Sequence, residues 1–112
     1  MIEVLLLDYL KGQMDCDVGL SLDDVSKDKY IVLEKASDYP EEGLNHATFN
    51  IFIHDQTLFK TAVLSEILKE ALISSQDEVD DISECDINYI RNYTDEVKKE
   101  PRYLCNVDFV FY

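Results

Sequence analysis

The stretch that decides the fold is residues 47–73, ATFNIFIHDQTLFKTAVLSEILKEALI. Its first half alternates between two kinds of side chain, which is typical of a strand with one buried face. The buried face is expected to be Ala47, Phe49, Ile51 and Ile53. Its second half predicts a helix that begins after a cap residue, Asp55 or Thr57, and ends at residues 74–77. We expect this helix to pack over the sheet and to cover the apolar face of the strand.

The predicted helix has more apolar surface than one sheet easily covers. At 100° per residue, one tight apolar stripe, broken only by Lys60, is expected to face the sheet. This stripe is Val63, Leu64, Ile67, Leu68 and Ala71. A second apolar arc, mixed with charged residues, is Leu58, Phe59, Ala62 and Ile73. Either an N-terminal helix packs on the second arc or a neighbouring subunit does, and the arc is therefore our candidate subunit interface.

The rest of the chain predicts elements that complete this unit. They are a helix over 2–10 ending at Lys11-Gly12, a short strand within 13–28, a strand over 29–36, a loop over 37–43, a strand from 44, and strands over 82–93 and 102–112 around a polar loop. Strands joined by short loops are most easily antiparallel. We expect one α+β domain over residues 1–112, with a mainly antiparallel four- to five-stranded sheet, two helices packed on one face, and the order α-β-β-β-α-β-β.

The strand over 82–93 is expected to place Cys85, Ile87, Tyr89 and Tyr93 on one face, because they share one phase.

The chain has three cysteines, an odd number, without CxxC spacing. No export signal precedes them, which favours a reducing compartment. We expect Cys85 and Cys105 to act as small hydrophobic core residues.

The composition argues against several classes of function. There are 24 acids against 10 bases, a formal net charge of −14, which disfavours binding to phosphate backbones. Such a charge also keeps a chain soluble at high concentration. Two more specific interpretations are a basic partner and a surface that does not stick to DNA. No apolar run approaches the roughly 20 residues of a membrane span. The first eight residues lack the basic start and cleavage site of a signal peptide.

No pattern of catalytic or metal-binding residues is present. The only histidines, His46 and His54, have no metal ligand at suitable spacing, and the acidic clusters lack the spacing of a calcium loop. Three glycines do not make a phosphate-binding loop, and no nucleophile motif occurs. We therefore expect no enzyme, no cofactor, no metal and no sequence-specific binding of nucleic acid.

Five segments in order carry a resemblance to a known family. They are MIEVLLLDYL (1–10), YIVLEKASDYP (30–40), ATFNIFIH (47–54), AVLSEILKEAL (62–72) and PRYLCNVDFVFY (101–112). In this order the chain resembles the tail terminator, or tail-completion (tail-to-head joining), proteins of tailed bacteriophages. The motifs are structural rather than catalytic, and the loops over 13–28 and 91–101 carry no matching signature.

The resemblance implies a non-enzymatic virion protein that is assembled in the host cytoplasm. Members of this family form rings, commonly hexamers, at the head-proximal end of the tail, where they end tail polymerisation and join tail to head. The implied partners are other copies of the chain, the tail tube protein and the head connector proteins. A lumen rich in Asp and Glu would repel the phosphates of the DNA that passes through it.

Three alternatives stay open. A head-side connector or minor capsid protein is also a small ring with docking loops. An acidic mimic of DNA, which inhibits a DNA-binding protein, would explain the charge but does not require the long amphipathic helix. A small enzyme that uses a pair of carboxylates is the third, although no other catalytic residue accompanies such a pair.

Overall fold

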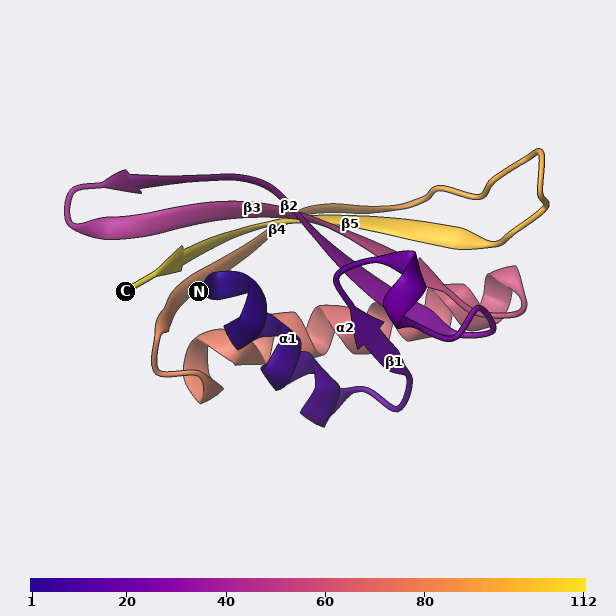
Figure 1. The fold of residues 1–112 in the computed structure, drawn as a ribbon, viewed down its shortest axis with the longest axis horizontal. Helices are drawn as coiled ribbons and strands as arrows, with labels where there is room; N and C mark the ends of the chain where they lie inside the picture. The colour runs from indigo at the N-terminus through magenta and orange to yellow at the C-terminus, as the bar shows by residue number, and fades with distance from the viewer.

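The computed structural model describes residues 1–112 and shows an α+β domain of two layers, a sheet and a layer of helices (Figure 1). The elements are α1 (Ile2–Gln13), β1 (Asp17–Gly19), the short 3-10 helix η1 (Leu22–Asp24), β2 (Tyr30–Glu41), β3 (Leu44–His54), α2 (Leu58–Glu78), β4 (Ile82–Asn92) and β5 (Arg102–Phe111). The two helices and the α+β class are confirmed. The molecule is elongated, with extents of 44 × 25 × 23 Å.

The sheet has five strands in the order β1-β2-β3-β5-β4. It is mixed, because β1 runs parallel to β2 whereas the other three pairs are antiparallel. Parallel neighbours need a crossover between them. Here η1 and its flanking residues form that crossover, and η1 is an addition to the expected order of elements.

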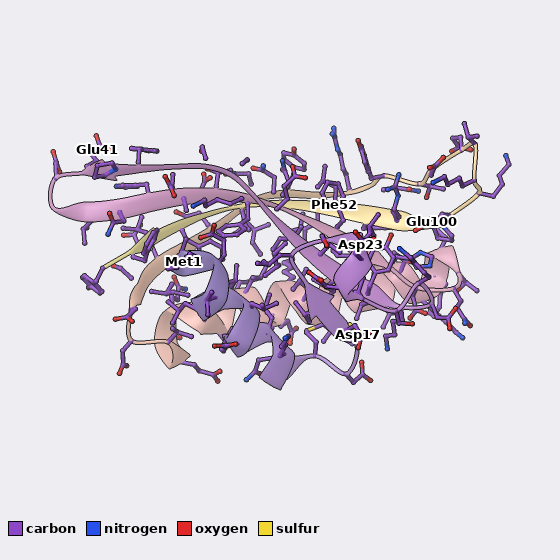
Figure 2. All side chains as sticks on the ribbon, in the orientation of Figure 1. Met1, Asp17, Asp23, Glu41, Phe52 and Glu100 are labelled. Carbon is purple, nitrogen blue, oxygen red and sulfur yellow. The ribbon has the colours of Figure 1, made fainter.

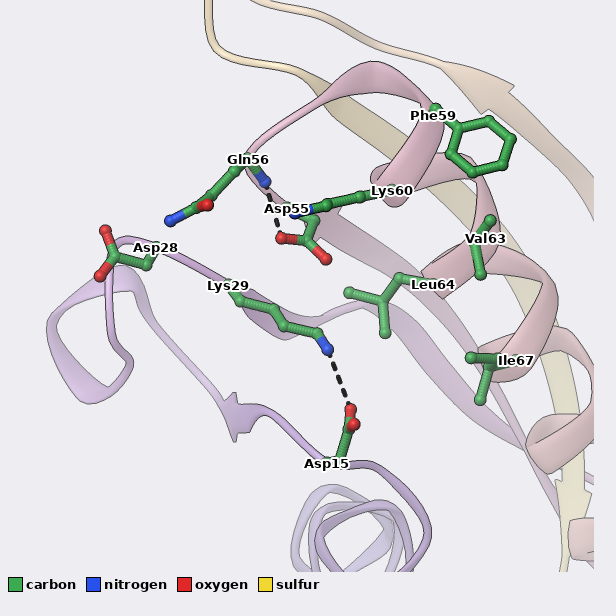
Figure 3. A pocket seen from close by; sticks show the side chains of 10 residues that line it. All are labelled: Asp15, Asp28, Lys29, Asp55, Gln56, Phe59, Lys60, Val63, Leu64 and Ile67. Atoms are coloured by element: carbon green, nitrogen blue, oxygen red, sulfur yellow. Dashed lines mark hydrogen bonds and ion pairs between the residues drawn. The ribbon is translucent and has the colours of Figure 1, made fainter.

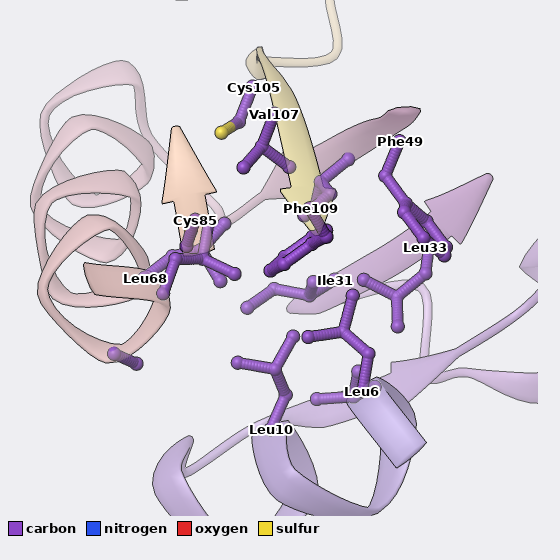
Figure 4. Packing of buried hydrophobic residues seen from close by; sticks show 14 of the residues in the cluster. Leu6, Leu10, Ile31, Leu33, Phe49, Leu68, Cys85, Cys105, Val107 and Phe109 are labelled. Atoms are coloured by element: carbon purple, nitrogen blue, oxygen red, sulfur yellow. The ribbon is translucent and has the colours of Figure 1, made fainter. Parts of the chain in front are cut away.

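One face of the sheet forms the core against both helices (Figure 4). Phe49, Ile51 and Ile53 of β3 are fully buried there, as expected. The rings of Phe49 and Phe109 meet edge to face at 5.8 Å, a favoured aromatic geometry. Cys85 and Cys105 are also buried in this core, which confirms the prediction for both thiols.

The inward side of α2 differs from the predicted stripe. The residues buried there are Thr61, Leu64, Ser65, Leu68, Ala71, Leu72 and Ser75. Val63 and Ile67 are instead exposed, so their assignment to the core was wrong. The buried hydroxyls are satisfied within the helix: Ser65 donates to the carbonyl of Ala62 at 2.7 Å. Small hydroxyl residues with such bonds can take core positions that an apolar pattern does not predict.

Both ends of α2 are defined by local chemistry. Thr57 is the N-cap, and its hydroxyl accepts from the backbone N–H of Lys60 at 3.1 Å. The choice between Asp55 and Thr57 is thereby settled in favour of Thr57. At the other end the helix continues to Glu78, beyond the stop expected at residues 74–77.

The loop predicted over 37–43 is wrong, because β2 continues to Glu41 and pairs with β3 there. The turn is only Glu42-Gly43, with φ of 53° and 81°, as a tight primed hairpin turn requires. Pro40 is compatible with the strand because β1 covers only Tyr30–Val32, which leaves the later part of β2 as a sheet edge. A register shift between Lys35 and Ser37 marks a bulge there.

The single face predicted for residues 85–93 is also wrong. Register shifts in β4 occur between Ile82 and Glu84 and between Ile87 and Tyr89. Each bulge moves the following side chains to the other face of the sheet. Tyr89 is therefore exposed, as is Tyr93, whereas Cys85 remains in the core.

Candidate interaction surfaces

A row of exposed apolar side chains runs along α2. Phe59, Val63 and Ile67, four residues apart, lie on one side of the helix and form what we call the outward strip (Figure 3). Phe59 is 77% exposed, Val63 44% and Ile67 49%. No other part of the chain covers this strip, although it is as apolar as much of the core.

The outward strip borders a groove of about 540 Å³ between α2 and the segment from residue 15 to residue 29. On the opposite wall, the ammonium of Lys29 lies 3.0 Å from a carboxylate oxygen of Asp15 (Figure 3). That hydrogen bond lowers the pKa of Asp15 and raises the pKa of Lys29. A second groove, also lined by Val63 and Ile67, continues toward Ser74. The strip is thus the apolar margin of a long, open depression.

Of the four predicted interface residues, three lie together in the first turns of α2, whereas Ile73 lies about three turns further along. Phe59 lies in the outward strip, about 100° around the helix from Leu58. Leu58 is exposed and Ala62 is half-buried. Ile73 lines a different groove, between α2 and β4, together with Ile87 and Ile90. Of the predicted set, only Phe59 belongs to the strip, and sequence reasoning missed Val63 and Ile67 because it placed both in the core.

The N-terminal helix does not cover the predicted arc. α1 reaches α2 on another flank, where the hydroxyl of Tyr9 donates to the backbone carbonyl of Ala71 at 2.7 Å. Its three fully buried side chains, Ile2, Leu6 and Leu10, pack into the core. The N-terminal helix is therefore not the partner of Phe59.

The uncovered face of the sheet carries a polar ladder. Thr48 donates to Asp108 at 2.6 Å, and Asn106 donates to Asn50 at 2.8 Å. Asn88 extends the ladder to β4 by donating to Asn106 and to Asp108. These side chains satisfy one another across three strands, so this part of the face is stable in contact with water.

A second surface that sequence reasoning missed lies where β4 and β5 join. The guanidinium of Arg91 lies 5.1 Å from the ring centre of Tyr89, and that of Arg102 lies 5.4 Å from the ring centre of Tyr93. The signal in the sequence is that residues 91–102 hold four of the ten bases, including both arginines. The bulges that expose Tyr89 could not be predicted from the alternation.

Both histidines have structural surroundings. His54 is buried, and its Nδ1 lies 2.6 Å from the carbonyl oxygen of Pro101. The ring of His46 stacks on that of Tyr39 at 4.9 Å.

No group of three or more His, Cys, Asp or Glu side chains is arranged to hold a metal ion. None of the helices is long and apolar enough to cross a membrane.

Comparison with known proteins adds no identity. No protein-family model matches the chain, and no curated protein matches it in sequence.

Proposed function

We propose that this protein is a non-enzymatic structural subunit that assembles with copies of itself, and that the outward strip of α2 contributes to the contact. The observation that carries the proposal is the exposure of Phe59, Val63 and Ile67 in the isolated chain. Large apolar side chains that gather on one surface usually mark a contact with another molecule. Phe59 is the anchor, because aromatic side chains supply much of the energy of interfaces.

The partner we propose for the strip is a second copy of the chain. At a net charge of −14, two copies repel each other over most of their surface. The groove beside the strip is lined by three acids and two bases, so it is less acidic than the chain as a whole: Asp15, Asp28, Asp55, Lys29 and Lys60. Covering a Phe, Val or Ile side chain completely contributes roughly 1.5–3 kcal/mol, so covering the exposed parts of these three contributes a few kcal/mol.

The resemblance of the five ordered segments to phage tail-completion proteins extends the proposal. In this form the copies make a ring, commonly a hexamer in that family, at the head-proximal end of a phage tail. The ring ends tail polymerisation and joins the tail tube to the head connector. The excess of acids supports this role, because an acidic ring lumen lets DNA pass without holding it.

The test is to measure the mass of the purified protein over a wide concentration range by light scattering, and to image the associated fraction by negative staining. We expect a defined oligomer and ring-shaped particles. In the Phe59→Glu variant, a charge replaces the most exposed residue of the strip, and we expect monomers with an unchanged fold.

The matched control is Leu22→Glu, which makes the same change of charge at an exposed leucine of η1 that does not line the groove. This variant should assemble like the wild type. Rings of Phe59→Glu would show that the strip is not the contact. A wild type that stays monomeric at every concentration and forms no particles would rule out self-assembly.

A further inference from the structure

The basic residues of this acidic chain are concentrated at one end of the molecule. Residues 91–102 hold four bases and three acids, whereas the whole chain holds 10 bases and 24 acids. This segment contains the connection between β4 and β5, which extends to one extreme of the long axis (Figure 1). We call this region the basic end and define it as Tyr89, Arg91, Tyr93, Lys98, Lys99 and Arg102.

All three acids in the segment have partners within the chain. Asp95 accepts hydrogen bonds from the backbone N–H groups of Val97 and Lys98, which lower the pKa of its carboxyl group. Glu100 accepts a hydrogen bond from the hydroxyl of Tyr30 at 2.6 Å. Neither Arg91 nor Lys98 has an ion-pair partner, although both are exposed. Lys99 and Arg102 are paired within the chain, with Glu96 at 4.0 Å and with Asp95 at 3.7 Å. The free positive charges of the basic end are therefore those of Arg91 and Lys98.

The side chain of Arg91 is held by contacts with aromatic rings, which leave the N–H donors of its guanidinium free for a partner. Its guanidinium lies 5.1 Å from the ring centre of Tyr89 and 5.9 Å from that of Tyr93. Stacking of this kind restricts a long side chain before a partner arrives, so less conformational entropy is lost on binding. The planar guanidinium fork matches a carboxylate, and Tyr and Arg are the residues most often found at the energetic centres of interfaces. Arg91 is thus prepared to receive a carboxylate.

The opposite end of the molecule has the complementary charge. Residues 77–84, at the end of α2 and the start of β4, contain five acids and no base: Asp77, Glu78, Asp80, Asp81 and Glu84. In Figure 1 this α2–β4 turn lies far along the long axis from the β4–β5 connection. Figure 2 places Glu41, the last residue of β2, toward the same end as the α2–β4 turn. The two charged regions therefore do not meet within one copy.

The acids of the α2–β4 turn are also placed unfavourably. Asp77 and Glu78 lie in the last turn of α2, which contains no basic residue. The negative end of the helix dipole repels acids there and favours a cation. An approaching guanidinium or ammonium group would relieve this repulsion.

We propose that the basic end of one copy docks on the acidic α2–β4 turn of a second copy. Because the two surfaces differ and lie at opposite ends, the contact is head-to-tail, which closes into a ring or continues as a chain. The inference rests on the proposed function, since it requires that copies associate. A short cluster of carboxylates suits the site better than nucleic acid, because an extended phosphate chain that continued along the sheet would also meet the paired Asp86 and Asp108 and be repelled there.

The test uses two charge-reversed variants and sedimentation velocity at low salt. The basic-end variant is Arg91→Glu with Lys98→Glu, and the acidic-end variant is Asp77→Lys with Asp80→Lys. Each reversal changes the net charge by two, so the variants carry −18 and −10 against −14. We expect the association constant of each variant alone to fall by about tenfold or more. A mixture of the two variants should associate again, because each unchanged end then finds a partner.

The acidic-end variant separates docking from general repulsion. If only net charge mattered, this variant at −10 would associate more strongly than the wild type. Raising NaCl from about 50 mM to about 500 mM should weaken association of the wild type, since the Debye length falls from over 10 Å to below 5 Å. Thermal melting of each variant verifies the fold.

Several outcomes would overturn the inference. Association that neither variant changes would refute head-to-tail docking and leave the proposed self-assembly intact. A wild type that is monomeric at every concentration would refute both. If a single-stranded oligonucleotide binds the wild type but not the basic-end variant, while both variants associate normally, then the site accepts phosphates rather than a second copy.

Discussion

The two sides of α2 are both apolar, yet they have opposite surroundings. The inward side places Leu64, Leu68 and Leu72 in the core, each at most 2% exposed. The outward strip leaves Phe59, Val63 and Ile67 in solvent. Stability should therefore depend on the inward side, and assembly on the outward side. One helix would then connect the core of each copy to its neighbour.

The largest effect on stability is expected at the inward side. Leu68 is completely buried, and Leu68→Ala removes its core contacts and leaves a cavity. We expect the free energy of unfolding to fall by about 2–5 kcal/mol, as measured by urea denaturation. Folded molecules of this variant should still associate.

Ile67→Ala is the matched control for this change, one residue away on the same helix. Because Ile67 is half-exposed, the loss of stability should be below about 1 kcal/mol, while association should weaken. Equal losses of stability in the two variants would mean that the outward strip is also buried in the monomer. The contrast between the two sides would then be wrong.

Alkaline pH should act on the core against which the inward side of α2 packs, through two thiols of β4 and β5. Burial raises the pKa of the Cys105 thiol from its ordinary 9.0 to about 12 and that of Cys85 to about 11. The unfolded chain therefore loses these protons at lower pH than the folded chain does. Stability is retained below pH 9 and falls as pH rises toward 11 and 12.

Urea denaturation across this pH range measures the alkaline loss. We expect the same slope in Phe59→Glu, because the strip contains no thiol, and a shallower slope in Cys105→Ala. Should Cys105→Ala retain the full slope, other groups would control the alkaline loss.

A smaller effect is expected at the N-cap, where α2 begins. Thr57→Ala removes the hydroxyl that accepts from the N–H of Lys60. We expect a loss of about 1 kcal/mol of stability, measured by thermal melting. Thr57→Ser retains the hydroxyl and should melt close to the wild type. If both variants melt alike, the cap contributes little.

The smallest effect on stability is expected from Phe59→Glu. Since Phe59 is 77% exposed, the change in the free energy of unfolding should be within about 0.5 kcal/mol. Urea denaturation at low protein concentration measures this value without assembly. A loss as large as that of Leu68→Ala would show that Phe59 has a structural role.

The sequence predicted the elements that have a regular pattern. The alternation around Phe49 and Ile51 predicted β3 and its buried face, and the final apolar strand was predicted within one residue of its end. The parallel position of β1 could not be predicted, because three residues carry no pattern of direction. Tyr89 was misplaced, since a bulge shifts the alternation without leaving a mark in the sequence.

The candidate site was predicted only in part. Leu58, Phe59 and Ile73 of the candidate arc are exposed in the single chain, but Val63 and Ile67, which are also exposed, were assigned to the core. The reason is that Thr61, Ser65 and Ser75 occupy the core side by bonding their hydroxyls to carbonyls of the same helix. An apolar stripe alone does not show which side of a helix faces the sheet when hydroxyl residues can be buried in this way.

The central claim is that the outward strip is covered when copies associate. Hydroxyl-radical footprinting at low and high protein concentration measures this directly, with Leu22 as an exposed reference outside the groove. We expect oxidation of Phe59 and Ile67 to slow several-fold at high concentration, while the oxidation of Leu22 is unchanged. Equal oxidation of Phe59 at both concentrations, in a sample that light scattering shows to be associated, would contradict the claim.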